Sequence, residues 1–283
     1  MERRFETPGP PTIEVRLPAG RVEISTHEGN ETIVQLEALR DNAASHKAVE
    51  NARVELRRSG GDDLVMVDVR EHSSFLSFSM GAEVEVRVQA PAASNLKTSL
   101  ASANLVGHGT LGSLEGHLAS GDLSVDDVTG DAEVRTASGD VRLTSVGGDL
   151  NVHSASGEVD IGRVDGSATM RTASGDVGLG VASSSVTVHT ASGDVRLGSV
   201  AAGRVSIQSA SGDVEVSIAR GAGAYIDAKS MSGDVSSELD VEETVPGGST
   251  VDLKATSMSG DIRIRSAREG RGSNGHPEPV RLV

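Results

Sequence analysis

Carboxylates recur at one position of a repeated tetrapeptide, Ala-Ser-Gly-Asp, and its close variants. Stacked carboxylates could supply oxygen ligands to calcium, as in rolls built from nine-residue repeats. Those rolls use Gly-Gly-x-Gly-x-Asp, which this chain lacks, and calcium takes six or more oxygens. We therefore expect no calcium, and interpret the carboxylates as a structural corner ladder that accepts backbone N–H groups: Asp122, Asp140, Glu158, Asp176, Asp194, Asp213, Asp234 and Asp261.

Histidine and arginine alternate at a second repeated position, which continues as Ser99 before the series and as Gln208 and Lys229 after it. Such cations could bind a linear anion or a partner protein, more strongly as the histidines protonate below about pH 6.5. Alternatively, the column is a solvated face that offsets nearby carboxylates such as Glu115 and Glu133. Both interpretations stay open, and the candidate partner-binding stripe is His117, Arg135, His153, Arg171 and His189.

The same residues do not form a recognisable catalytic or metal site. The three histidines of the stripe are two repeats apart, roughly 10 Å in a stacked fold, too far to share one zinc ion through bonds of about 2 Å. The serines recur as members of a series, and none stands out beside a His and an Asp. We predict no catalytic residue, no metal site and no cofactor.

Both series arise from an internal repeat that must position them. The tetrapeptide serine recurs every 18 residues from Ser102 to Ser192, and the last three spacings lengthen to 19, 21 and 27. Each unit holds two short alternating segments separated by glycine-containing turns, which is typical of strands. The corner glycines indicate positive φ or a lack of space for Cβ. Hydroxyls two residues before each tetrapeptide serine are expected to satisfy corner amides: Thr136, Ser154, Thr172 and Thr190.

The sequence predicts an all-β fold, a parallel β-solenoid (β-helix) of about nine 18-residue rungs. Two sheets face each other, and apolar columns such as Val134 above Val152 fill the space between them. Each rung is stable only through its neighbours, and nine rungs spaced ~4.8 Å apart would make a rod of roughly 43 Å. A right-handed coil follows from the general preference of parallel crossovers.

Three segments are expected along the chain. Residues 1–94 form an N-terminal β-rich capping region, with a hairpin turn at Gly60–Asp63 and a short helix over Asn42–Ala52. Residues 95–267 form the solenoid, in which the insertion Val241–Thr250 covers the last rung, and residues 268–283 form a flexible tail.

The composition argues against several classes of ligand. The formal charge is −15, and aromatic residues make up 1% of the chain. Nucleic acid or an anionic membrane would require a basic footprint, and stacking on bases or sugars would require rings. We expect a protein partner. The N-terminus lacks an apolar signal region, so we expect a cytoplasmic protein without membrane insertion.

The segment Pro18–Ile24 (PAGRVEI), followed by recurrent ASGDV and GDLxV rungs, resembles the bacterial "putative adhesin" β-strand-repeat family of unknown function, which is LiaG-like. The resemblance covers nearly the whole chain. It implies a non-enzymatic, adhesin-like interaction or scaffold protein with a link to cell-envelope stress, and it supplies no catalytic residues. Two alternatives are a self-assembling, bactofilin-like cytoskeletal rod and a polysaccharide-active β-helix enzyme.

Overall fold

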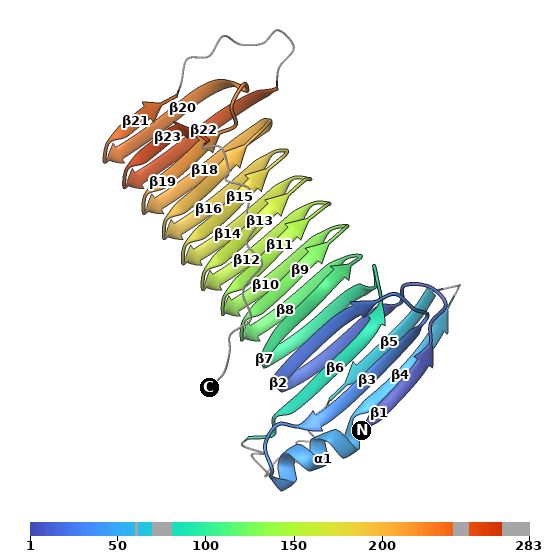
Figure 1. Ribbon diagram of the computed structural model, residues 1–283. Coiled ribbons are helices and arrows are strands. Elements are labelled where there is room, and N and C mark those ends of the chain that lie inside the picture. The colour runs from blue at the N-terminus through green and yellow to red at the C-terminus, as the bar shows by residue number, and fades with distance from the viewer. Residues whose placement is uncertain (60–61, 70–80, 240–248, 268–283) are drawn as a thin grey trace, which may run out of the picture.

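The fold is an elongated β-solenoid with a small antiparallel region at one end (Figure 1). It is seen in a computed structural model that describes residues 1–59, 62–69, 81–239 and 249–267. These residues form 23 strands and the short helix α1 (Ala43–Asn51). The predicted all-β fold class is therefore confirmed.

Each rung of the repeat contributes one strand to each of two parallel ladders. The first ladder contains β8 (Leu114–Ser120), β10 (Ala132–Ser138), β12 (Leu150–Ser156), β14 (Ala168–Ser174), β16 (Val186–Ser192) and β18 (Gly203–Ser211). The second contains β9 (Leu123–Val128), β11 (Val141–Val146), β13 (Val159–Val164), β15 (Val177–Ala182), β17 (Val195–Val200) and β19 (Val214–Ile218). Register follows the repeat, because Val134 lies beside Val152 and Val152 beside Met170.

The parallel stack also continues to the N-terminal side of Asn95. Two long strands, β2 (Thr12–His27) and β7 (Asn95–Leu111), each span both ladders and pair in parallel from Thr12–Asn95 to Ser25–His108. On its other side β2 pairs with β5 (Asp62–Asp68) through its first half and with β6 (Val84–Pro91) through its second half. A rung without the tetrapeptide therefore begins the stack. The division of the chain at residues 94 and 95 stays a prediction.

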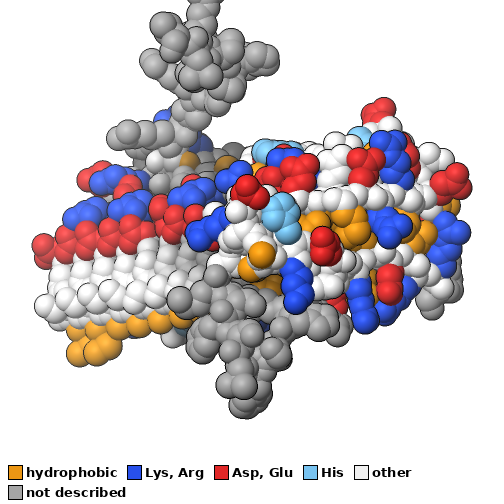
Figure 2. All heavy atoms as spheres, turned by 90° about the horizontal axis from the view of Figure 1, so that it is seen from below, with side chains coloured by type: hydrophobic (Ala, Val, Ile, Leu, Met, Phe, Trp, Pro, Cys, Tyr) orange, Lys and Arg blue, Asp and Glu red, His pale blue; other side chains and the backbone are white. Residues whose placement is uncertain are grey.

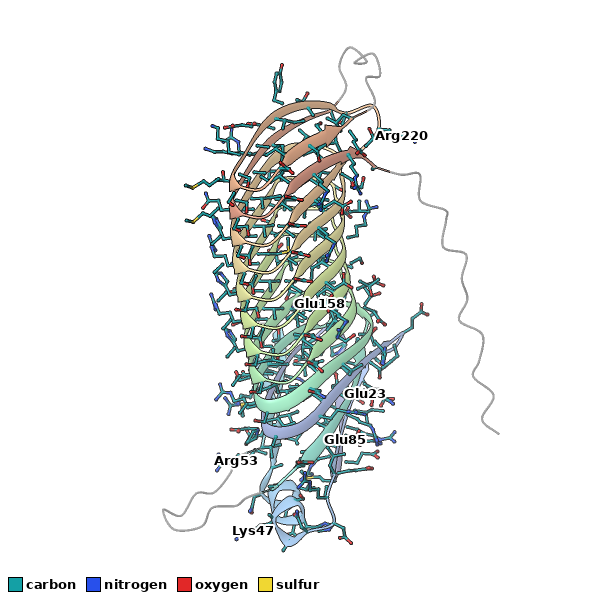
Figure 3. All side chains as sticks on the ribbon, turned by 90° about the vertical axis from the view of Figure 1, so that its left-hand side faces the viewer. Glu23, Lys47, Arg53, Glu85, Glu158 and Arg220 are labelled. Atoms are coloured by element: carbon teal, nitrogen blue, oxygen red, sulfur yellow. The ribbon has the colours of Figure 1, made fainter. Side chains whose placement is uncertain are left out.

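Antiparallel strands close this end of the rod. The outer strands are β1 (Glu2–Glu6), β3 (Glu31–Ala38) and β4 (Arg53–Ser59), where β1 pairs with β3, β3 with β6, and β4 with β5. The β4–β5 pairing confirms the hairpin, although residues 60 and 61 of its turn lie outside the described residues. The side chain of Asn42 caps α1 by accepting the Ser45 N–H at 2.7 Å. Lys47 on α1 and Arg220 mark the two ends of the molecule in Figure 3.

The last two rungs stack in the reverse of their chain order. The strands β22 (Thr250–Ser259) and β23 (Ile262–Ser266) pair directly with β18 and β19. The preceding strands β20 (Gly223–Ser232) and β21 (Val235–Glu238) lie outside them and form the end of the stack (Figure 1). Our expectation of nine rungs in simple succession is therefore wrong at this end. The predicted covering insertion falls mostly on residues 240–248, which lie outside the described residues, as does the predicted tail.

The core explains this order. Inward positions of the inserted rung carry large apolar side chains that are fully buried, such as Leu253 and Ile262. At the positions paired with Ile262 and Ile264, the end rung carries the smaller side chains of Val235 and Ser237. An end rung is covered on one side only, so placing the more hydrophobic rung inside removes more apolar surface from water.

The corner glycines pack backbone against backbone. Gly121, Gly139, Gly157 and Gly175 all have φ between 117° and 121°. A Cβ built on Gly175 would lie 2.1 Å from the Gly157 carbonyl oxygen. The corner positions therefore require glycine both for its positive φ and because a Cβ would have no space there, the two reasons predicted from the sequence.

Candidate functional groove

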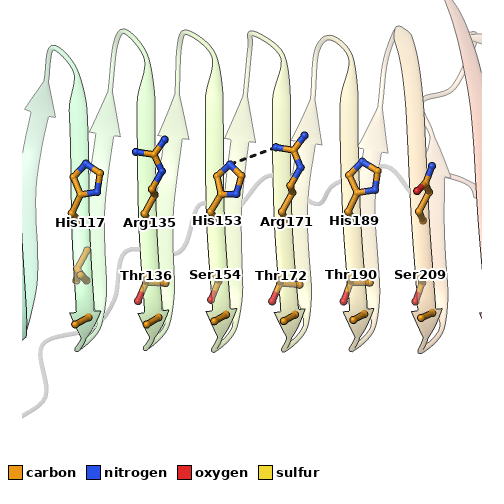
Figure 4. A pocket seen from close by; sticks show the side chains of 18 of the residues that line it. His117, Arg135, Thr136, His153, Ser154, Arg171, Thr172, His189, Thr190 and Ser209 are labelled. Atoms are coloured by element: carbon orange, nitrogen blue, oxygen red, sulfur yellow. Dashed lines mark hydrogen bonds between the residues drawn. The ribbon is translucent and has the colours of Figure 1, made fainter.

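All five residues of the predicted stripe line one groove, which crosses the first ladder at right angles to its strands (Figure 4). The groove has a volume of about 1340 Å³ and extends from Ser99 on β7 to Met258 on β22. It therefore crosses eight stacked strands, β7, β8, β10, β12, β14, β16, β18 and β22, a length of roughly 34 Å at ~4.8 Å per rung.

Because successive side chains of a strand point to opposite faces, three columns of side chains line the groove: two that face outward and one between them that faces inward. In β10, Arg135 and Ala137 face outward, and Thr136 between them turns inward and is 7% exposed. Parallel in-register pairing repeats this arrangement in each rung. One wall is consequently cationic, and the other is a row of alanine methyl groups that our sequence reasoning missed: Ala101, Ala119, Ala137, Ala155, Ala173, Ala191 and Ala210. The signal was present in the sequence, because alanine recurs at this position in each tetrapeptide from Ala101 to Ala210.

The column ends differently from our expectation. Lys229 is not the neighbour of Gln208; Thr256 of the inserted rung pairs with Gln208, and Lys229 pairs with Thr256 beyond it. Lys254, two residues before Thr256, lines the groove instead. This correction follows from the reversed order of the last two rungs.

The inward hydroxyls stabilise the corner through carbonyl groups. Thr136 donates to the Ser138 carbonyl oxygen at 3.0 Å, and Thr172 donates to that of Ser174 at 3.1 Å. Ser154 and Thr190 make the same contact in their rungs. The sequence-based expectation that these hydroxyls satisfy corner amides was wrong, because the amides are already paired with carboxylates and with the next rung.

Charge is balanced unevenly along the groove. Near its N-terminal end, Glu115 pairs with Lys97 at 2.8 Å and contacts His117 at 3.4 Å, and Glu133 pairs with Arg135. From β12 to β16, the neighbouring outward column is neutral: Asn151, Thr169 and Thr187. Within the described part of the chain, Arg171 has no carboxylate partner, and its guanidinium contacts the His153 ring at 3.5 Å. The charge of Arg171 is therefore not balanced by a carboxylate of the described residues.

The pKa of His153 is lowered from its ordinary value, first by partial burial and then by the charges of Arg171 and Arg135, against a weaker opposing effect of Glu133. Substitution R171Q is expected to raise this pKa while leaving it below that of free histidine, because burial and Arg135 remain. A proton NMR titration of the His153 ring measures the change. An unchanged pKa in R171Q would show that the two side chains are not coupled.

The acidic ladder occupies a different edge of the rod. Six of the eight carboxylates accept the backbone N–H of the equivalent residue in an adjacent rung, as in Asp140 N–H to Asp122 at 3.0 Å and Asp213 N–H to Asp194 at 2.9 Å. Arg142, Arg196 and Arg263 pair with these carboxylates. Figure 2 shows the resulting parallel rows of acidic and basic side chains.

These contacts explain how like charges can stack. A hydrogen bond from the Glu158 backbone and an ion pair with Arg142 lower the pKa of Asp140, and equivalent contacts with Asp261 and Arg263 lower that of Asp213. Among the described residues, no three His, Asp or Glu side chains are grouped so that they could hold a metal ion. The ladder carboxylates are held by hydrogen bonds and ion pairs within the chain.

The Toastrack DUF4097 family matches residues 11–265 of the chain. No curated protein matches the chain. Within the described residues, no helix has the length and hydrophobicity needed to cross a bilayer.

Solved structures have a similar fold at low sequence identity. A "putative lipid binding protein" from Parabacteroides distasonis is 11% identical, with a TM-score of 0.53 over 93% of this chain and 96% of that one. A "putative adhesin" from Bacteroides fragilis is 10% identical, with a TM-score of 0.46 over the same shares of the two chains. At such identities the likeness concerns the fold alone.

Proposed function

Because this chain belongs to the Toastrack DUF4097 family, a β-solenoid family, we propose that it is a non-enzymatic, adhesin-like binding protein. Its groove holds an extended acidic segment of a partner protein. The observation that carries this proposal is Arg171, which has no carboxylate partner among the described residues and lies between His153 and His189 in a long groove, where the neighbouring outward column is neutral.

The shape of the groove supports an extended ligand. Its cross-section repeats from β8 to β16, where each rung offers a histidine or arginine on one wall and an alanine on the other. The small alanines leave space for ligand side chains, and acidic side chains spaced along a strand could reach Arg135 and Arg171 in turn. Charge-assisted hydrogen bonds from arginine to carboxylates are roughly twice as strong as neutral ones.

The groove lining also supports binding over catalysis. The hydroxyls of Thr136, Ser154, Thr172 and Thr190 are buried and already donate to carbonyl groups. A nucleophile would require one distinguished hydroxyl beside a base, whereas here each is one of a series. The cationic side chains likewise repeat, as expected of a surface that recognises a linear partner.

The proposal is tested by fluorescence anisotropy with a labelled poly-glutamate peptide as the probe. We expect binding at low ionic strength that weakens with salt, and at least about tenfold weaker binding to R135Q/H153Q/R171Q, which loses two cations and a hydrogen-bonding ring. The matched control R57Q/R163Q removes two exposed arginines outside the groove and should bind like the natural chain.

Two results would overturn the proposal. Equal binding by R135Q/H153Q/R171Q and the natural chain would show that the groove is not the site. Binding to phosphatidylserine vesicles without binding to the peptide would assign the groove to an anionic lipid instead of a protein segment. Circular dichroism of each variant checks that the solenoid is intact.

A further inference from the structure

Exposed apolar side chains gather at the C-terminal end of the rod. Tyr225 is 74% exposed and Met231 81% exposed, both on the outer face of β20. At core positions of the same rung, Ile226 is 39% and Val235 47% exposed, whereas the equivalent core residues of β18 and β19 are fully buried. Such a concentration of exposed apolar surface on a soluble rod indicates an interaction site.

The backbone at this end also has unpaired edges, as far as the described strands show. Among the described strands, β20 pairs with β22 alone and β21 with β23 alone, so each has one free edge. Free edges can accept another strand, and natural proteins normally protect them. At the opposite end, the antiparallel strands and α1 finish the rod differently. The two ends are therefore not equivalent, and the C-terminal end has the surface suited to continued β-pairing.

The sequence of β20 is complementary to itself in the antiparallel direction. Around Ala228 as a centre, Asp227 lies opposite Lys229 of a second copy, and Tyr225 lies opposite Met231. All four side chains are exposed, and they alternate along one face of the strand. The interface therefore contains two opposite-charge pairs and two contacts between sulfur and an aromatic ring, both of which are favourable across strands.

We propose that two copies of this chain associate tail to tail, through antiparallel pairing of β20 with β20 centred on Ala228. A two-fold axis at right angles to the ladders superposes β20 on β20 and β21 on β21, so both ladders continue from one copy into the other. The pairing covers Ile226 and Val235, which otherwise face water at the end of the core. It gives a closed dimer, because a two-fold axis uses the same edge of both copies.

The test exploits the two charges. The D227K chain presents two lysines to its copy and the K229D chain presents two aspartates, so neither should form the homodimer well. A mixed dimer of D227K with K229D has both opposite-charge pairs across the interface. Neither chain of this dimer retains the intramolecular Asp227–Lys229 pair of 3.0 Å. We expect the mixed dimer to form at least about tenfold more tightly than either homodimer at low salt.

Sedimentation velocity over a dilution series, with one variant fluorescently labelled, measures all three species. The natural chain is expected to dimerise, and K47D, a charge reversal on α1 at the far end, should dimerise equally. A monomeric natural chain throughout the series, or a mixture that associates no better than the single variants, would overturn the proposal. Because these substitutions lie outside the groove residues tested above, failure here leaves the proposed groove function unaffected.

Discussion

Substitution G175A is expected to lower the free energy of unfolding by about 4 kcal/mol, because two costs add. The residue has φ of 121°, which an L-amino acid rarely adopts. In addition, the new Cβ would lie 2.1 Å from the Gly157 carbonyl oxygen and 2.8 Å from its carbon. These atoms are backbone in the adjacent rung, so they can move only if the rungs separate. Urea denaturation followed by circular dichroism measures the loss.

The matched control is G178A, three residues further along the same rung. Gly178 has an ordinary φ, and the nearest atom to its added Cβ is a side-chain oxygen of Asp160 at 3.2 Å, which can shift. Alanine in a strand loses less conformational entropy than glycine, so G178A should change stability by less than about 1 kcal/mol. Equal effects of G175A and G178A would mean that the corner does not require glycine.

The solenoid could be predicted because the 18-residue repeat determines which residues pair between rungs. An apolar residue that recurs every 18 positions has one arrangement in which each copy is covered by the next, and Val134, Val152 and Met170 adopt it. A shift by one residue would turn these side chains outward. The same register puts Arg135, His153 and Arg171 in one column on the outer face.

The ends were harder to predict because stacking order there does not follow chain order. The long spacing between Ser232 and Ser259 indicated an insertion between these two rungs. It did not indicate that the second of them stacks between the first and the rest of the solenoid. Comparing Leu253 with its partner Ile226, and Ala255 with Ala228, does not separate the two rungs. The difference is clear only when Ile262 and Ile264 are set against Val235 and Ser237. At the other end, β2 forms a rung without any tetrapeptide to reveal it.

Side-chain chemistry in the groove was predicted only in outline. Alternation of histidine and arginine is visible in the sequence, but the lowered pKa of His153 depends on its burial and on both neighbouring arginines. The sequence identified the inward hydroxyls but not their acceptors. The turn at the corner directs the carbonyl group of Ser138, and of the equivalent serine in other rungs, toward the hydroxyl two residues earlier, such as that of Thr136. Such details depend on turn geometry, which a repeat period does not specify.

The second large effect is expected from I161A, which should lower the free energy of unfolding by about 3 to 4 kcal/mol. Ile161 is fully buried at the middle of the stack, where it pairs with Leu143 on one side and with Leu179 on the other. The cavity cannot collapse readily, because both adjacent rungs are held in register by their own backbone hydrogen bonds. The midpoint of urea denaturation measures this loss.

The outward residue Val181 provides the control for I161A. It lies on β15, in the adjacent rung, is 36% exposed and has Arg163 and Ser199 as its strand partners. Substitution V181A removes branched carbons without leaving a cavity, so a cost below about 1 kcal/mol is expected. In a stack stabilised through nearest neighbours, a cavity weakens the rung interfaces on both of its sides, whereas an outward truncation weakens neither. Comparable losses in I161A and V181A would contradict a core that is closed between the two ladders.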